Sequence, residues 1–354
     1  MPNDLILVTG GSGFLGSHCL LAAVNAGYRI RTTVRSLSRA DEVREMLRSG
    51  GASEDRIVSV EFAEADLIND EGWDRACKGC KYILHNASPF PGKAPKDEND
   101  LFEPAVGGTL RVLKAAKAAG TVERVVLTAS TACMVFGHSD KRLASGPFTE
   151  TDHTNLDNPS SPVPAYSKSK TLAERAAWDF IKNKGDGMEL VTIHPCGIYG
   201  PVLSQATASA TSISLIEWLM NGTIPMIPQL GFGVVDVRDV AALHLLALTS
   251  DKAAGQRFLA VGDEYIDAPM VGQILREELE EKAKRVPTWT APNLLLKFVG
   301  LSDAQMGGLS YELGRRKEES NSKAKKVSGW RPRSQRESIV DTARSLERLG
   351  KLKG

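Results

Sequence analysis

Three side chains in the middle of the sequence have the types and the spacing needed to protonate an alkoxide. Tyr166 and Lys170 are four residues apart at the start of a helical pattern, so they share one face of a helix. A phenol has a pKa of about 10, and a nearby ammonium favours the phenolate and lowers that pKa. Ser130 follows an apolar strand and could donate to a substrate carbonyl. The pattern predicts acid–base catalysis at a carbonyl by Ser130, Tyr166 and Lys170.

Each of these residues also has an ordinary structural interpretation, and a glycine-rich loop near the N-terminus gives them a context. Glycines 10, 13 and 16 follow the first apolar strand and open a helix. In a dinucleotide-binding βαβ unit such glycines allow a tight turn, close approach to a pyrophosphate and close helix packing. The predicted contacts of this loop with the dinucleotide are Gly10, Ser12, Gly13, Phe14, Leu15 and Gly16.

The end of the second strand predicts which dinucleotide is bound. An enzyme that uses NAD places Asp or Glu there to bind the ribose hydroxyls. This chain has Arg35, with Arg39 close behind, and a guanidinium suits the 2′-phosphate of NADPH. The alternative is an arginine that only faces solvent. After the third strand, Asp66 and Leu67 are candidates for the adenine, although Asp66 also fits a helix N-cap.

Strand and helix patterns alternate along most of the chain, which predicts an α/β fold of the Rossmann type, a doubly wound parallel sheet covered by helices. The expected strands are Leu5–Val8, Tyr28–Val34, Ile57–Phe62, Tyr82–Ala87, Arg124–Thr128, Glu189–Ile193 and a strand near Phe258–Val261. The expected helices are Phe14–Ala26, Arg39–Arg48, Glu98–Ala119, Ala165–Lys182, Asp239–Leu248 and one near Pro269–Glu281. Residues 1–200 are expected to form the NADP-binding domain, with its sheet completed by segments around 230–262. Residues 201–229 and 263–354 are expected to bind the substrate.

The composition of the chain argues against several classes of binding partner, namely nucleic acid, membranes and metals. The formal net charge is +1, from 44 basic and 43 acidic residues, so no field favours nucleic acid. No apolar run approaches the length of a membrane span, and no secretory signal is apparent. The five dispersed cysteines fit a reducing cytoplasm, and the pair Cys77 and Cys80 lacks the companions of a metal or redox site. We therefore expect a cytoplasmic protein without a metal.

The whole chain resembles an extended short-chain dehydrogenase/reductase. It is similar to the branch of dihydroflavonol reductases, cinnamoyl-CoA reductases and fungal aldehyde or methylglyoxal reductases. The matching segments are Thr9–Gly16, Thr33–Arg35, Ala65–Leu67, His85–Pro89, Thr128–Ser130, Tyr166–Lys170, Leu172–Glu174, His194–Pro195, Tyr199–Pro201, Val235–Asp239 and Gly329–Pro332.

The resemblance implies a role for each matching site residue. Tyr166 would be the proton donor, Lys170 its activator and a ligand of the nicotinamide ribose, and Ser130 the group that orients the carbonyl. Further cofactor contacts would come from Ala87, Ser88, Pro195 and Ile198. The implied function is NADPH-dependent reduction of an aldehyde or ketone of a small hydrophobic molecule, by a monomer or a homodimer.

Some positions depart from that branch. Asn86 replaces a small apolar residue or Thr, Ala129 replaces a common second Ser, and Val135 occupies about the position where flavonoid reductases often have Asn. A plant-type flavonoid substrate is therefore not expected. The substrate pocket is expected between the sheet and the segments Val202–Gln229 and Pro287–Leu309.

Three other functions on the same fold are weighed. A nucleotide-sugar epimerase or dehydratase shares the glycine loop and the Tyr–Lys pair, but Thr131, Ala132 and Cys133 supply no acid for dehydration, and Arg35 argues against NAD. A sterol-type dehydrogenase is a further possibility. A catalytically silent NADP-binding regulator would usually have lost the Tyr or the Lys, and this chain keeps both.

Overall fold

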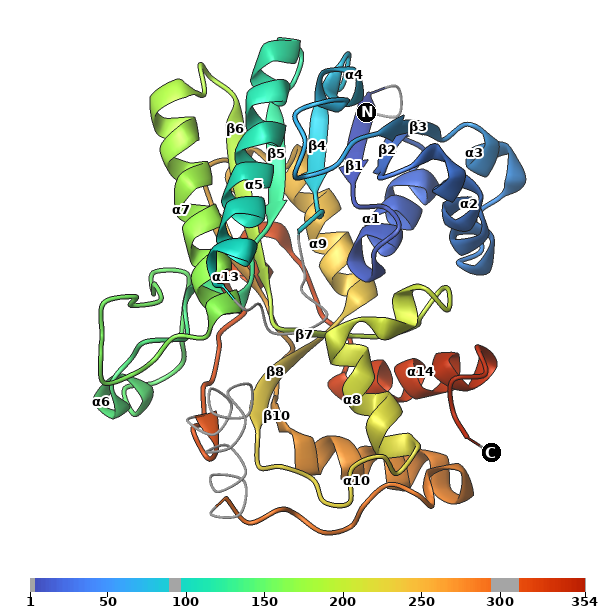
Figure 1. The fold of residues 1–354 in the computed structure, drawn as a ribbon, viewed down its shortest axis with the longest axis vertical. Coiled ribbons are helices and arrows are strands. Elements are labelled where there is room, and N and C mark those ends of the chain that lie inside the picture. The colour runs from blue at the N-terminus through green and yellow to red at the C-terminus, as the bar shows by residue number, and fades with distance from the viewer. Residues whose placement is uncertain (1–3, 89–96, 294–311, 354) are drawn as a thin grey trace.

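Seven strands form one parallel sheet, in the order β3-β2-β1-β4-β5-β6-β9. The computed structural model describes residues 4–88, 97–293 and 312–353 of the chain. The strands of the sheet are β1 (Leu5–Thr9), β2 (Arg29–Val34), β3 (Glu61–Glu64), β4 (Tyr82–His85), β5 (Arg124–Thr128), β6 (Glu189–Pro195) and β9 (Arg257–Ala260). The central strands are almost continuously apolar and buried, as expected for a sheet that is covered on both faces. The expected α/β fold of the Rossmann type is confirmed (Figure 1).

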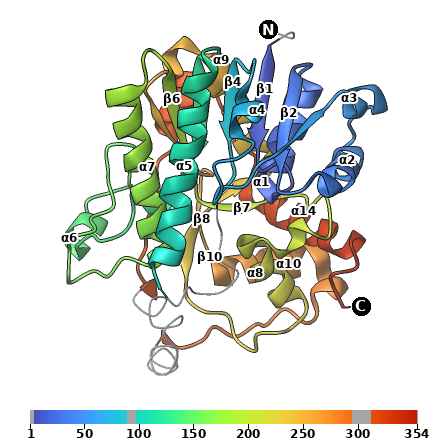
Figure 2. The same ribbon diagram turned by 45° about the horizontal axis from the view of Figure 1, so that its top comes forward.

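Helices cover both faces of this sheet (Figures 1 and 2). One face packs against α1 (Phe14–Asn25), α2 (Ala40–Ser49), α3 (Glu54–Val58) and α9 (Val237–Thr249). The other face packs against α4 (Trp73–Cys77), α5 (Asn99–Ala119) and α7 (Ala165–Lys184). Within the described ranges, no helix has both the length and the apolar character that a membrane crossing requires.

A smaller sheet lies apart from the main one. It has the order β10-β8-β7, and its strands are β7 (Gly197–Tyr199), β8 (Gly231–Asp236) and β10 (Tyr265–Asp267). Figure 1 shows it grouped with α8 (Thr211–Met220), α10 (Ala268–Leu279) and α14 (Gln335–Arg348). The other α-helices of the described residues are short, namely α6 (Asp140–Leu143) and α13 (Ser322–Ser328). Of the segments around 230–262, β9 completes the main sheet, whereas β8 pairs in the smaller sheet.

One expected strand is wrong. Residues 57–62 were expected to be extended, but Ile57 belongs to helix α3, and strand β3 starts only at Glu61. Ser53 occupies the N-cap position of α3, and two acidic residues follow it in the first turn. Both features favour the start of a helix. The buried Ile57 side chain therefore reaches the core from a helix.

The glycine loop depends on a very close approach between its first and third glycines. Gly10 has a φ of +71°, which favours glycine. A Cβ atom on Gly16 would lie 2.0 Å from the carbonyl oxygen of Gly10. This position therefore has no space for a side chain, as the loop motif predicts.

We predict that Gly16→Ala lowers the free energy of unfolding by about 1–3 kcal/mol, because an extra methyl group would overpack a rigid backbone contact. Gly107→Ala is the matched control. Its Cβ would meet no backbone atom, only the Nη1 of the Arg111 side chain at 3.0 Å, and alanine is the better helix former. Denaturant unfolding measures both variants. Equal stability of the two would contradict the proposed contact.

Three buried histidines lie against the main sheet, namely His18 in α1, His244 in α9 and His85 at the end of β4. His18 Nε2 lies 2.8 Å from the carbonyl oxygen of Pro201, and His244 Nδ1 donates to the carbonyl of Val240 at 2.8 Å. His85 Nδ1 lies 2.8 Å from the hydroxyl of Thr9. Burial lowers the pKa of His18 and His244 to about 4 and that of His85 to about 3. All three are therefore neutral at pH 7 in the folded chain.

These pKa values predict a loss of stability in mild acid. Each histidine has a pKa of about 6.5 when unfolded. Below that pH the unfolded chain binds more protons than the folded chain, so the free energy of unfolding falls as the pH falls from 6.5 toward 4. The loss is about 2 kcal/mol per histidine between pH 6.5 and pH 5. Urea unfolding at several pH values measures it. His18→Asn should have a shallower pH dependence, and an unchanged slope would contradict this origin.

Candidate active site

Helix α7 and the end of strand β5 bring the three predicted catalytic residues together. Tyr166 and Lys170 lie in the first turns of α7, one turn apart. Ser130 follows β5, and its hydroxyl accepts a hydrogen bond from the backbone N–H of Ala132 at 3.1 Å. The Ser130 and Tyr166 side chains are hydrogen-bonded to each other. The serine and the phenol can therefore act on the same oxygen atom of a ligand.

Lys170 is bound to the backbone of the strand that carries Ser130. Its Nζ donates to the carbonyl oxygen of Thr128 at 2.9 Å. The side chain is buried, and burial lowers the pKa of Lys170 from its usual value. The ammonium is thus fixed at the carboxyl end of β5.

The pKa of Tyr166 differs from the sequence-based expectation. Burial raises the pKa of the phenol to about 12, and the hydrogen bond with Ser130 offsets only part of that effect. We expected Lys170 to lower this pKa, but its ammonium is directed at the carbonyl of Thr128. At neutral pH the phenol is therefore protonated, which is the form that can donate a proton.

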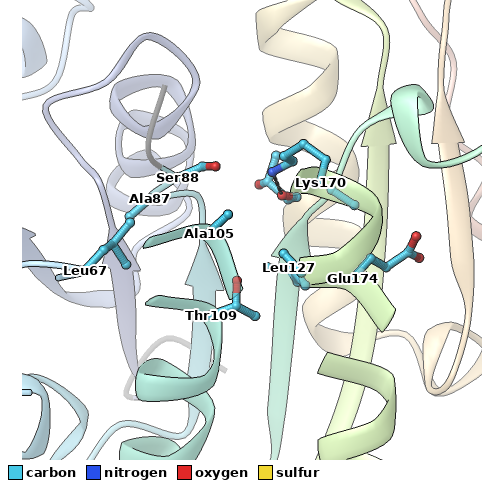
Figure 3. Close-up of a pocket in the computed structure, with 11 residues that line it drawn as sticks. Leu67, Ala87, Ser88, Ala105, Thr109, Leu127, Lys170 and Glu174 are labelled. Atoms are coloured by element: carbon cyan, nitrogen blue, oxygen red, sulfur yellow. Dashed lines mark hydrogen bonds between the residues drawn. The ribbon is translucent and has the colours of Figure 1, made fainter. Parts of the chain in front are cut away.

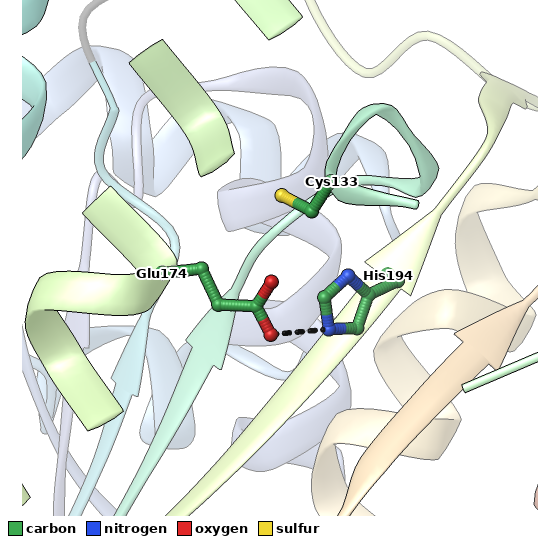
Figure 4. A group of neighbouring side chains, drawn as sticks. All are labelled: Cys133, Glu174 and His194. Atoms are coloured by element: carbon green, nitrogen blue, oxygen red, sulfur yellow. Dashed lines mark ion pairs between the residues drawn. The ribbon is translucent and has the colours of Figure 1, made fainter. Parts of the chain in front are cut away.

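A buried ion-pair network supports the turn that begins at Ser130. His194 Nδ1 donates to the carbonyl oxygen of Ser130 at 3.0 Å, and His194 Nε2 lies 3.0 Å from the carboxylate of Glu174 (Figure 4). Arg257 binds the same carboxylate through Nε at 2.8 Å and Nη2 at 3.0 Å. Burial alone would raise the pKa of Glu174, but His194 and Arg257 more than offset that effect and lower it. Glu174 therefore carries its charge within the core.

The same network also resembles a metal-binding cluster. Potential ligand atoms of Cys133, Glu174 and His194 lie within 4.8 Å of one another (Figure 4). However, the guanidinium of Arg257 already neutralises the carboxylate. Burial raises the pKa of the Cys133 thiol, which disfavours the thiolate that a metal needs. We therefore interpret the cluster as a structural ion pair.

A cleft of about 450 Å³ lies along the carboxyl edge of strands β1, β2 and β4. Its lining includes eight of the residues predicted to bind the dinucleotide, namely Gly10, Ser12, Gly13, Arg35, Asp66, Leu67, Ala87 and Ser88. The exposed Gly13 is the N-cap of α1, so the positive end of that helix dipole faces the cleft. This is the geometry that a pyrophosphate requires.

A second, narrower pocket continues from the cleft toward the catalytic residues. Figure 3 shows Lys170 and Glu174 of α7 across from Ala105 and Thr109 of α5. Ala87 and Ser88 line both cavities. The nucleotide cleft and the pocket that contains Lys170 therefore share part of their walls.

The remaining predicted cofactor residues lie outside the lining of the cleft. Phe14 and Leu15 are buried in the first turn of α1. Pro195 ends β6 in the core, and Ile198 is half-buried in β7, where it pairs with Val235.

The two arginines after β2 have different environments. Arg35 is exposed and lines the cleft, and no ion-pair partner is found for its guanidinium among the described residues. Arg39 instead forms a two-pronged pair with Glu42, with distances of 2.9 Å and 3.1 Å. Arg35 is thus available to a phosphate, whereas Arg39 is held by a carboxylate.

Asp66 combines the two interpretations that its sequence left open. Its carboxylate accepts a hydrogen bond from the backbone N–H of Ile68 at 3.2 Å, so it stabilises a local turn. It is not the N-cap of α4, because Gly72 occupies that position. Asp66 also lines the cleft beside Leu67, where an adenine amino group would find an acceptor.

Two buried polar atoms at the end of β4 lack a partner in the part of the chain that the structure describes. They are His85 Nε2 and Asn86 Nδ2. The other end of the Asn86 amide accepts from the hydroxyl of Thr128 at 2.7 Å, which gives this unusual residue a structural role. Unpaired buried polar groups are costly. Asn86 lines the cleft, so its unpaired nitrogen, together with the glycine cradle and Arg35, fits a cleft that binds a polar dinucleotide.

Sequence reasoning missed the residues that hold the three predicted catalytic side chains in place. These are Thr128, which binds Lys170, and the Arg257–Glu174–His194 network under Ser130. Glu174 and His194 lie within segments that match the reductase branch. Their pairing joins residues far apart in sequence, so no local pattern could predict it.

Known proteins share this architecture over nearly the full chain. Ketoreductase azaE of Aspergillus niger is 34% identical over 81% of this chain and 86% of its own length. The NADPH-dependent methylglyoxal reductase GRE2 of Saccharomyces cerevisiae is 31% identical over 96% of this chain and 97% of its own. The crystal structure of the yeast methylglyoxal/isovaleraldehyde reductase Gre2 complexed with NADPH superimposes with a TM-score of 0.78, at 28% identity. That match covers 98% of this chain and 100% of the other.

The model of the NAD dependent epimerase/dehydratase family matches residues 6–262. This range includes the residues that line the cleft and the three predicted catalytic residues Ser130, Tyr166 and Lys170. This match spans well over half of the chain. The expected resemblance to extended short-chain dehydrogenases/reductases is thereby confirmed. The chain belongs to the NAD dependent epimerase/dehydratase family.

Proposed function

We propose that this protein is an oxidoreductase that uses NADPH to reduce the carbonyl group of a small molecule to an alcohol. The observation that carries the proposal is the hydrogen-bonded pair of Ser130 and a protonated Tyr166, next to a cleft built for a dinucleotide. The relatives named as NADPH-dependent methylglyoxal reductase and as ketoreductase support the same reaction and the same cofactor.

Each residue of the site has its own role in the proposed reduction. NADPH supplies the hydride when it is bound. Ser130 donates a hydrogen bond to the carbonyl oxygen as negative charge develops there. Tyr166 gives that oxygen its proton, and burial keeps the phenol in the acid form until then. Lys170 positions the phenol and binds the nicotinamide ribose from its place on Thr128.

The cleft residues hold the nucleotide in this assignment. Gly10, Ser12 and Gly13 take the pyrophosphate at the start of α1, and Arg35 takes the 2′-phosphate. Asp66 and Leu67 take the adenine, and Ala87 and Ser88 line the path to the nicotinamide. By resemblance to the reductase branch, Phe14, Leu15, Gly16, Arg39, Pro195 and Ile198 complete the proposed set.

The substrate side is formed by the parts of the chain around the smaller sheet. We assign residues 201–229 and 263–354 to it, with residues 1–200 as the nucleotide-binding part. A part of the expected pocket, residues 294–311, lies outside the described residues. By resemblance to the reductase branch, we propose a small hydrophobic carbonyl compound as the substrate.

The cellular setting follows from the surface and from the thiols. Five free cysteines, four of them buried, suit the reducing cytoplasm. A formal net charge of +1 favours a small-molecule substrate over nucleic acid. We propose that the protein acts away from membranes, as a monomer or a homodimer.

The first test is stoichiometry. We expect one NADPH to be consumed for each alcohol formed when the protein is given a panel of aldehydes, diketones and keto-esters. Absorbance at the nicotinamide band and product analysis measure the two amounts. An epimerase or dehydratase would convert a nucleotide sugar with no net change in NADPH, and that outcome would overturn the proposal.

The second test removes the proton donor. Tyr166→Phe should lower kcat by about 10²–10⁴-fold, because it removes general acid catalysis while keeping the ring. Binding of NADPH, measured by fluorescence titration, should change little. Tyr82→Phe is the matched control, since Tyr82 lies at the opposite, amino end of β4. Full turnover by Tyr166→Phe would show that another group is the acid, or that catalysis is not the role of this site.

A further inference from the structure

The inference concerns the cavity beside Arg35 and rests on the proposed use of NADPH. This cavity, of about 310 Å³, adjoins the nucleotide cleft, with which it shares Arg35 and Asp66. Its lining brings together two arginines and three carboxylates, namely Arg35, Arg75, Glu64, Asp66 and Glu71. A phosphate on the adenosine ribose next to Arg35 would therefore meet charges of both signs.

Glu64 is held close to Arg35 by the sheet and by a hydrogen bond. In the parallel pairing of β2 and β3, Glu64 lies opposite Val34, the residue before Arg35. Its carboxylate also accepts the backbone N–H of Leu37 at 3.1 Å. The negative charge is thus fixed beneath the turn that Arg35 begins.

The positive charges at this turn are fewer than the sequence suggests. Arg39 is paired with Glu42, so its charge is already neutralised. Arg75 is exposed on α4 at the rim of the cavity. Asp66 and Glu71 add further negative charge to the same lining. Arg35 and Arg75 are therefore the cations that this cavity offers to a 2′-phosphate, and Glu64 acts against them.

We propose that Glu64 is a specificity-determining residue that weakens the preference for NADPH and lets the same site accept NADH. A 2′-phosphate carries close to two negative charges at neutral pH, so a fixed carboxylate nearby repels it. A ribose 2′-hydroxyl carries no charge, and it can donate a hydrogen bond to a carboxylate. Glu64 therefore weakens the binding of the phosphorylated ribose only.

The test measures binding of the two adenosine fragments by calorimetry, without any turnover. Glu64→Gln keeps an acceptor for the N–H of Leu37 and removes the charge. We expect it to tighten the binding of 2′,5′-ADP about three- to tenfold at low salt, and to change that of 5′-AMP less than twofold. The gain should shrink at high salt, because screening weakens the repulsion.

Two further variants make the result specific. Glu45→Gln removes one negative charge from the exposed face of α2, where Glu45 pairs with Arg48 at 3.1 Å, so it controls for net charge alone. Arg35→Gln should weaken 2′,5′-ADP and spare 5′-AMP. An unchanged or weaker affinity of Glu64→Gln for 2′,5′-ADP would overturn the inference, as would an equal gain from Glu45→Gln. If the wild-type chain bound neither NADPH nor 2′,5′-ADP, the proposed function itself would fail.

Discussion

The bond between the Lys170 ammonium and the carbonyl oxygen of Thr128 ties helix α7 to the end of strand β5. These two elements position all three residues that we propose to be catalytic, because Tyr166 lies one turn before Lys170 and Ser130 lies two residues after Thr128. The contact is buried, so water competes little for either group. This junction between helix and sheet therefore helps to fix the relative position of the phenol and the serine.

A second set of contacts holds the backbone of Ser130 in place. The carboxylate of Glu174, on the same helix, orients His194, and His194 binds the carbonyl oxygen of Ser130. Arg257 of β9 neutralises that carboxylate, so the edge strand of the sheet contributes to the geometry of the site. A buried ion pair is costly to break, because one unpaired charge would remain in the core. The network therefore restrains the Ser130 turn without touching the substrate.

The sequence predicted the order of the main elements because the central strands are almost continuously apolar runs and long helical segments alternate with them. It failed where pairing is not local. The strands of the smaller sheet are short, and β8 begins with glycines, so neither length nor periodicity identifies them. At Ile57 a buried apolar residue was taken for part of a strand, although the capping pattern before it favours a helix.

At the site, residue types and spacing were enough to place Ser130 near Tyr166. The charge environment of the phenol, however, could be determined only from the three-dimensional structure. Spacing alone suggested that Lys170 lowers the pKa of the phenol, whereas the structure turns that cation toward a backbone carbonyl and leaves burial to dominate. Likewise Arg39 pairs with Glu42, three residues later. The sequence shows that this pair can form, but it does not show whether Arg39 binds Glu42 or the cofactor phosphate. The consequence is chemical. Because burial raises its pKa to about 12, Tyr166 is protonated at neutral pH, which is the form that the proposed reduction needs.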